Sequence, residues 1–202
     1  MPKIGIICEG TRDGADAQVL RYFADCILAA PISEAVPLGN KPNLFDRCGK
    51  VAKALRESGC ERILIVWDLL PAWGDQPASA ASDAAKVRAS LAAEGLDKDP
   101  CVFLVAIDRE LETWLVSDTA ALSAVIPTPP NSVTIRALAK PVAESNPKKW
   151  LMKKFREIGR GGRTYMPERN AVEIAKAMPA NLRAIRKIPS FQKFEKGLLV
   201  PC

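Results

Sequence analysis

The sequence contains no histidine among its 202 residues. This absence excludes Ser-His-Asp and Cys-His nucleophilic pairs, HExxH peptidases and nucleases whose metal is held by imidazole, because each of these sites needs a histidine as base or ligand. Acid–base chemistry in this protein must therefore use carboxylates, lysine, tyrosine or a bound metal.

Paired cysteine motifs and long apolar runs are also missing. The six cysteines include no CxxC pair, which favours buried thiols over a zinc site or a disulfide framework. No stretch approaches the roughly 20 apolar residues that a membrane-spanning helix needs, and no signal-peptide pattern precedes the first strand-like run. We therefore expect a cytoplasmic protein without a membrane partner.

The charge is distributed unevenly along the chain. Apolar residues make up 48% of the sequence, which is enough for one well-buried core. Residues 1–139 hold 14 basic and 18 acidic residues, whereas residues 140–202 hold 15 and 5. A basic C-terminal segment favours a polyanionic partner such as nucleic acid about as strongly as it favours a solvated helical surface.

Strand-like and helix-like segments alternate over the first part of the chain. Compact apolar runs predict strands, and apolar residues at helical spacing predict the helices between them. The predicted strands are 3–8, 32–39, 62–68 and 101–108, and the predicted helices are 14–28, 44–59 and 82–95. This alternation predicts an α/β fold with a mostly parallel sheet covered by helices on both faces. We expect 32–39 at the sheet edge, because it contains a proline, and Ser82 or Asp83 as a helix cap.

The C-terminal part reads as helical and basic. Residues 109–126 begin a helical region, residues 126–132 form a connector, and several short helices follow from about residue 145. We predict an α/β core over 1–126 and a basic helical C-terminal region over 127–202 that packs on this core, giving one domain overall.

Three predicted strands end in an acid, namely Glu9, Asp68 and Asp108. The carboxyl ends of parallel strands line the crevice in which α/β proteins bind ligands, so these side chains are expected to approach one another. Converging carboxylates repel, and Mg²⁺ or Mn²⁺ relieves that repulsion with oxygen ligands alone. Taken singly, each acid is better explained as a helix cap, and only their joint occurrence favours a metal site.

Further candidates follow in the sequence. Glu110 and Glu112 lie two residues apart on a predicted helix, so at most one of them points into the crevice, and Trp114 beside them is expected to pack in the core. Basic residues fill one amphipathic helix, namely Lys148, Lys149, Lys153, Lys154 and Arg156. The Gly-rich segment with Arg160 and Arg163 suits a phosphate backbone, and Tyr165 suits base stacking, although an ordinary basic surface loop explains them equally well.

Six motifs carry a resemblance that spans nearly the whole chain. They are IICEGTRD, IVWDLL, AIDRELETWLVSD, NPKKWL, RTYMP and IPSFQKF. Together they resemble a bacterial family of Toprim-like proteins, related to the nuclease half of overcoming-lysogenization-defect (OLD) systems and often found beside an ATPase. The resemblance implies a Toprim-like sheet, Glu9 as a general acid or base, and Asp68 as the first aspartate of an Asp-x-Asp metal pair.

The chain departs from this family pattern at Leu70, which occupies the position of the second aspartate. Asp75, Asp108 and Glu112 are the candidates for the missing oxygen ligand, with Glu112 preferred; otherwise metal binding and catalysis are weakened or lost. The leading hypothesis is a Mg²⁺-dependent nuclease acting on DNA or RNA in phage defence, with an ATPase partner. The alternatives are a non-catalytic module that binds nucleic acid or a protein, and a small-molecule enzyme with an enclosed apolar pocket.

Overall fold

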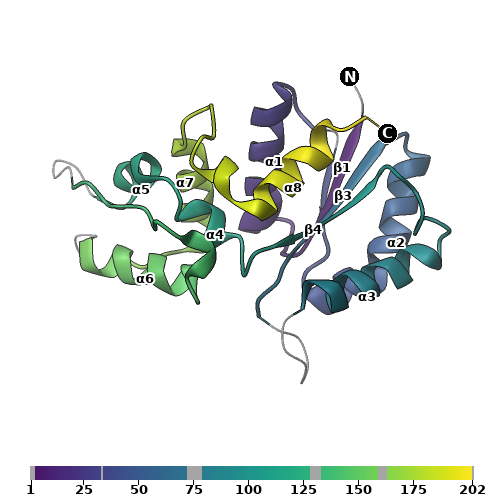
Figure 1. Ribbon diagram of the computed structural model, residues 1–202, viewed down its shortest axis with the longest axis horizontal. Coiled ribbons are helices and arrows are strands. Elements are labelled where there is room, and N and C mark those ends of the chain that lie inside the picture. The colour runs from purple at the N-terminus through teal and green to yellow at the C-terminus, as the bar shows by residue number, and fades with distance from the viewer. Residues whose placement is uncertain (1–2, 33, 72–78, 128–132, 159–162, 202) are drawn as a thin grey trace.

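A four-stranded parallel sheet forms the centre of the protein (Figure 1). The computed structural model describes residues 3–32, 34–71, 79–127, 133–158 and 163–201. The strands are β1 (Ile4–Cys8), β2 (Glu34–Pro37), β3 (Arg62–Asp68) and β4 (Val102–Ile107), in the order β2-β1-β3-β4. The predicted fold class is confirmed, and β2 lies at an edge of the sheet, as its proline indicated.

The helices largely follow the predicted ranges. They are α1 (Ala15–Leu28), α2 (Lys41–Glu57), α3 (Ala80–Ala92), α4 (Glu112–Leu115), α5 (Thr119–Val125), α6 (Pro147–Ile158), α7 (Val172–Ala177) and α8 (Pro189–Leu199). A π-helical turn, Pro167–Ala171, precedes α7. The predicted cap of α3 is wrong, because the Ser79 hydroxyl accepts the hydrogen bond from the backbone N–H of Ser82 and starts the helix earlier.

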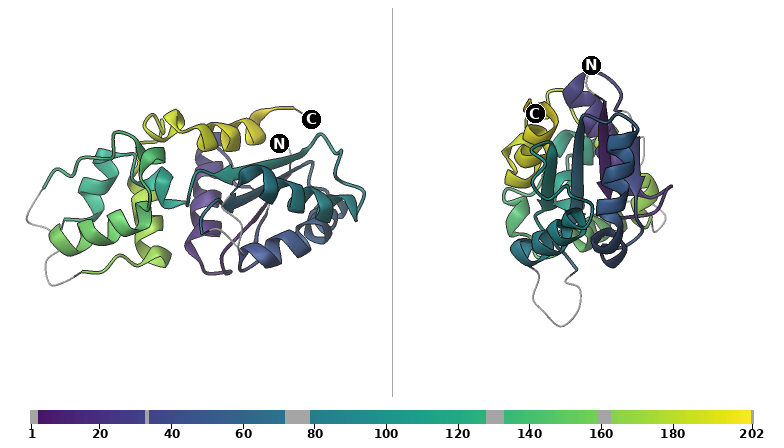
Figure 2. Two further views of the ribbon diagram at one scale, coloured as in Figure 1. Left: turned by 60° about the horizontal axis from the view of Figure 1, so that its bottom comes forward. Right: turned by 90° about the vertical axis from the view of Figure 1, so that its right-hand side faces the viewer.

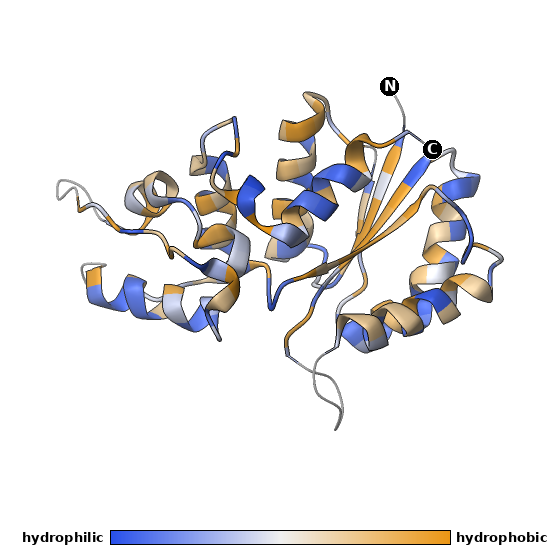
Figure 3. Cartoon of the chain, in the orientation of Figure 1, coloured by the Kyte–Doolittle hydropathy of each residue, from blue (hydrophilic) through white to orange (hydrophobic). Residues whose placement is uncertain are grey.

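Helices cover both faces of the sheet (Figures 1 and 2). One face packs against α1 and α8, whose buried residues join Ile6 and Leu64 in one apolar cluster. The other face packs against α2 and α3, which form a second cluster with Ile7 and Ile65. Neighbouring strand residues thus point to opposite layers, and the interiors of the strands are largely apolar (Figure 3).

The C-terminal helices share the first of these clusters. Trp114 is fully buried, and its ring packs against Phe23 of α1 and against Phe191 and Phe194 of α8. Its indole N–H donates a hydrogen bond of 3.0 Å to the hydroxyl of Ser190. The prediction that Trp114 packs in the core is confirmed, and this aromatic group ties α4 and α8 to α1.

The cysteines only partly follow the sequence prediction. Cys8, Cys26, Cys48 and Cys60 are free thiols, whereas Cys101 is disulfide-bonded, so the expectation of thiols alone is wrong there.

Among the described residues, none of the helices is both long enough and apolar enough to traverse a bilayer.

Helices α2 and α3 are in close contact at Gly49. A Cβ atom added at this position would lie 2.0 Å from the carbonyl oxygen of Ser90, which is backbone and cannot rotate away. We expect Gly49→Ala to lower the free energy of unfolding by about 1–3 kcal/mol, measured by urea denaturation. Ala54→Ser, at an exposed position of α2, is the control and should change it by less than about 0.5 kcal/mol. Equal stability of the two variants would contradict this packing.

Candidate active site

Two of the predicted acids meet at the carboxyl edge of the sheet. Cys8 lies opposite Val66 in the pairing of β1 with β3, so Glu9 follows its strand beside the last residues of β3. The backbone N–H of Asp68 donates a hydrogen bond of 3.1 Å to Oε1 of Glu9. The side chain of Glu9 therefore lies across the end of the neighbouring strand, next to Asp68.

A third acid, Asp16, joins them from the first turn of α1. Gly10 adopts a φ of +88°, and a Cβ atom at that residue would lie 2.4 Å from Oδ2 of Asp16. Only glycine both tolerates this conformation and leaves space for the carboxylate. The sequence analysis did not single out Asp16, because an acid in the first turn of a helix is normally explained by the helix dipole.

The three carboxylates are held in a poorly solvated and mutually repulsive environment. The pKa of Glu9 is raised to about 7, chiefly by burial; Lys41 and the hydrogen bond from the Asp68 N–H lower it, and the charges of Asp16 and Asp83 raise it. Burial also raises the pKa of Asp68 well above its usual value, with the charges of Asp16 and Glu9 next in importance. The pKa of Asp16 is likewise raised, chiefly by burial. This cluster therefore favours binding a proton or a cation.

Lys41 places a positive charge beside the cluster. It is buried at the first position of α2, where a cation opposes the helix dipole. Its ammonium donates to the carbonyl oxygens of Leu69 at 3.0 Å and Pro71 at 3.1 Å, and it pairs with Asp83 at 3.5 Å. Lys41 thus fastens the chain that follows Asp68. The sequence analysis did not single out Lys41, because it placed the start of this helix at residue 44, whereas the structure starts it at Lys41.

Glu112 is the buried member of the Glu110–Glu112 pair. It is 6% exposed on α4 and accepts a hydrogen bond of 3.1 Å from the hydroxyl of Tyr165. Burial raises the pKa of Glu112 to about 7, and the charge of Glu110 acts in the same direction. The charge of Glu112 in turn raises the pKa of Asp68, so the two carboxylates share one electrostatic environment.

Two other predicted acids accept hydrogen bonds from the backbone at the start of distant helices. Asp108 accepts a hydrogen bond of 3.3 Å from the backbone N–H of Ser190 at the start of α8. Glu110 accepts one of 2.6 Å from the backbone N–H of Lys148 at the start of α6. Asp108 thus caps a helix far along the chain rather than the helix that follows its strand, and Glu110 does the same at α6, whereas Glu9 and Asp68 lie together. Asp75 lies outside the described residues.

The residues at this edge suit a hard cation chemically. In the part of the chain that the structure describes, no three acidic, cysteine or histidine side chains are grouped closely enough to hold a metal ion as they stand. Mg²⁺, however, is usually held by only one or two carboxylates and keeps several waters. Asp68 and Asp16 offer the oxygen ligands that such an ion needs and are the residues that would hold it, and Glu9 beside them adds to the unrelieved negative charge.

The predicted basic helix is α6, and its first turn lies close to these acids. The charge of Lys148 lowers the pKa of both Asp16 and Glu112. Trp150, which the sequence analysis did not single out, is partly exposed on the same helix and has the ammonium of Lys154 5.7 Å from its ring centre. A groove of about 430 Å³ is lined by Glu144, Ser145, Asn146, Lys149, Trp150, Met152, Lys153 and Arg156.

The remaining basic candidates differ in availability. Lys153 and Lys154 form ion pairs with Glu157. Arg163 is exposed, and Arg160 lies outside the described residues.

Tyr165 is only 3% exposed and its hydroxyl is hydrogen-bonded to Glu112, so the expectation that it stacks on a base is wrong. It follows a Gly-rich segment, which suggested a surface loop, but its ring packs on Phe155.

Known proteins share the fold of this chain but little of its sequence. No protein-family model and no curated protein sequence matches the chain. The chain is similar in structure to the C-terminal region of the OLD protein of Burkholderia pseudomallei, with a TM-score of 0.51 and 17% sequence identity. The similarity covers 98% of this chain and 99% of that one. At this identity, the comparison shows a common fold.

Proposed function

We propose that the protein is a Mg²⁺- or Mn²⁺-dependent nuclease that hydrolyses phosphodiester bonds of DNA or RNA. The observation that carries this proposal is the meeting of Glu9, Asp68 and Asp16 at the carboxyl edge of a parallel sheet, with pKa values raised by burial and mutual repulsion. Strongly shifted carboxylates gathered at a ligand-binding edge are typical of functional sites. The fold similarity to the OLD C-terminal region and the Toprim-like motifs support the same assignment.

Each residue has a distinct role in the proposal. Glu9 accepts or donates the proton of the attacking or leaving group. Asp68 and Asp16 hold the metal ion, and Glu112 is the further carboxylate that we assign to this site. When bound, the ion would polarise the phosphate and lower the pKa of a bound water. Asp108, engaged as a cap of α8, has no role in this scheme.

The basic face of α6 supplies the proposed contact with the substrate. Lys148 and Lys149 attract the phosphate backbone, and Trp150 offers a ring for stacking beside them. In line with the motif resemblance, we also propose an ATPase partner and a role in phage defence.

The proposal is tested by cleavage assays of the wild type and Asp68→Asn on single-stranded and duplex DNA and on RNA, with Mg²⁺, Mn²⁺ or EDTA. Asparagine keeps the size of the side chain but removes the charge that attracts a cation. We expect Asp68→Asn to lower the cleavage rate at least about 100-fold, because metal sites depend on deprotonated ligands. Equal activity of the two proteins, or wild-type activity in EDTA, would reject the assignment.

A second candidate function is a non-catalytic module that binds nucleic acid or a partner protein. Leu70 supports it, because an aliphatic side chain replaces the second metal-binding aspartate of the Toprim-like pattern. Salt-sensitive binding of nucleic acid without cleavage of any substrate, in any of these metals, would favour this module over the nuclease.

A further inference from the structure

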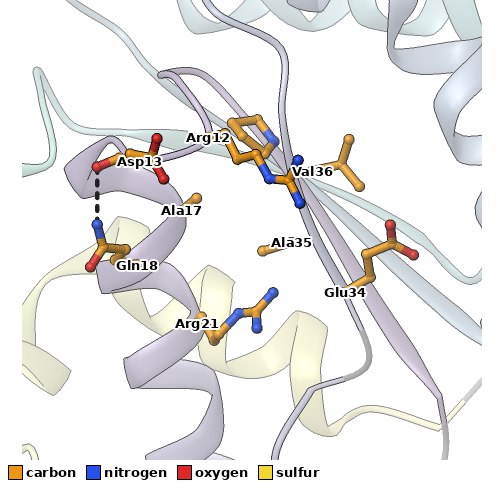
Figure 4. Close-up of a pocket in the computed structure, with 9 residues that line it drawn as sticks. Arg12, Asp13, Ala17, Gln18, Arg21, Glu34, Ala35 and Val36 are labelled. Atoms are coloured by element: carbon orange, nitrogen blue, oxygen red, sulfur yellow. Dashed lines mark hydrogen bonds between the residues drawn. The ribbon is translucent and has the colours of Figure 1, made fainter.

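An open groove separates α1 from the edge strand β2 (Figure 4). Its volume is about 770 Å³. It is lined by Arg12, Asp13, Ala17, Gln18, Arg21, Glu34, Ala35, Val36 and Pro37. Small and apolar side chains from both elements form its base, and polar side chains rise around them.

Two exposed arginines make the groove suitable for an anionic ligand. Arg12 and Arg21 are both exposed, and their guanidinium groups extend over the space between helix and strand (Figure 4). Neither forms a hydrogen bond or an ion pair with any other described residue. By contrast, Gln18 is engaged, since its amide donates to the carbonyl oxygen of Asp13 at 3.0 Å. Both guanidinium groups therefore keep their donors available for an anion, and planar guanidinium groups bind phosphate in a bidentate manner.

One end of the groove meets the candidate active site. Arg12 lies three positions after Glu9 in the loop that leads to Asp16. Pro37 pairs with Cys8, the residue before Glu9. From there β2 runs back to Glu34 over about 10 Å, at roughly 3.3 Å per residue. The groove is therefore a path that ends at the acidic edge and is long enough for more than one phosphate group.

We propose that this groove holds a single-stranded segment of nucleic acid that leads to the Glu9–Asp68 edge, with Arg12 and Arg21 contacting different phosphates of that strand. The inference rests on the proposed function and names the form of substrate that its site takes. The volume of about 770 Å³ lies in the range of sites for small ligands, so the groove has room for a short stretch of a single strand. Ala17, Ala35 and Val36 give sugars and bases an apolar surface.

The groove also carries two acids, Asp13 and Glu34. They oppose the binding of any polyanion and restrict the phosphates to the vicinity of the arginines. The two acids therefore allow a test of the charge of the ligand, because replacing an acid should strengthen the binding of an anionic ligand.

The test is equilibrium binding of a fluorescent single-stranded oligonucleotide of about a dozen nucleotides in EDTA. Arg12→Ala and Arg21→Ala are each expected to weaken binding about three- to tenfold at low salt and to reduce the slope of log K against log salt by about 0.7. Glu34→Gln is expected to strengthen binding. Arg47→Ala removes an exposed arginine from α2, on the opposite face of the sheet, and should have no effect.

Several outcomes would overturn the inference. Arginine variants that bind like Arg47→Ala, or a Glu34→Gln variant that binds no more tightly than the wild type, would show that the strand lies elsewhere. Equal losses with a duplex of the same sequence would reject the single-stranded form. These binding assays contain EDTA and are independent of cleavage. Binding that depends on the groove, without cleavage in the metal assays, would support the inference and reject the nuclease. Cleavage without binding that depends on the groove would support the nuclease and reject the inference.

Discussion

Replacing Glu9 by glutamine is expected to slow the proposed metal-dependent cleavage by about 10²- to 10⁴-fold, the usual contribution of a positioned general acid or base. Glutamine retains an oxygen that can accept the hydrogen bond from the Asp68 N–H. The end of β3 should therefore keep its position, and the loss should come from proton transfer and from the missing charge. Single-turnover cleavage rates at saturating Mg²⁺ measure this effect.

The control for Glu9→Gln is Asp46→Asn, which removes an exposed carboxylate from α2. It should cleave at the wild-type rate. Thermal unfolding of the three proteins shows whether each is folded under assay conditions. A folded Glu9→Gln variant with the activity of Asp46→Asn would reject the role of Glu9.

The stability of the metal-free protein is expected to fall as the pH rises from about 5 to about 8. Folding raises the pKa of Glu9 and of Glu112 from the usual 4.5 to about 7, in each case chiefly through burial. The folded protein therefore holds protons that the unfolded chain has already lost. The resulting stabilisation is complete below about pH 4.5 and disappears as the pH rises through 7, and each group contributes on the order of 3 kcal/mol.

Urea denaturation in EDTA at pH 5 and pH 8 measures this pH dependence. Glu112→Gln should reduce it, because glutamine can still accept the hydrogen bond from Tyr165 but does not ionise. Glu157 and Glu173 have lowered pKa values, so their contribution to stability increases as the pH rises. Their ion pairs are solvated, and this contribution is the same in the wild type and in Glu112→Gln, so it cancels when the two are compared. Mg²⁺ at pH 8 should raise the stability of the wild type and have a smaller effect on Asp68→Asn. A variant with the wild-type pH dependence would contradict the assignment for Glu112.

The strands and the meeting of Glu9 with Asp68 could be predicted from the sequence, because both follow from local patterns and one topological rule. Buried apolar runs define strands, and parallel strands place their final residues at one edge. The same rule suggested Asp108, but it does not state which way a side chain turns. In the structure, the start of α8 lies close to Asp108, and the backbone N–H of Ser190 donates a hydrogen bond to its carboxylate.

The missed and misassigned residues depend on contacts between distant segments. Asp16 joins the site through its closeness to Gly10 across a loop, and Lys41 is buried because it reaches carbonyl oxygens 28 and 30 residues further along the chain. Tyr165 lies 53 residues from its partner Glu112. No periodicity or short motif reports such distances, so these assignments required the folded structure.

The buried ammonium of Lys41 helps the fold to tolerate the acids that it gathers at the carboxyl edge of the sheet. It acts as a resident counter-ion that the chain brings with it, fixed by three oxygen acceptors and already offsetting part of the charge of Glu9. A dication bound there, as proposed, would have less repulsion left to relieve than the number of carboxylates alone would suggest. In the proposed metal site, binding would depend mainly on Asp68 and Asp16, whose pKa values are raised chiefly by burial.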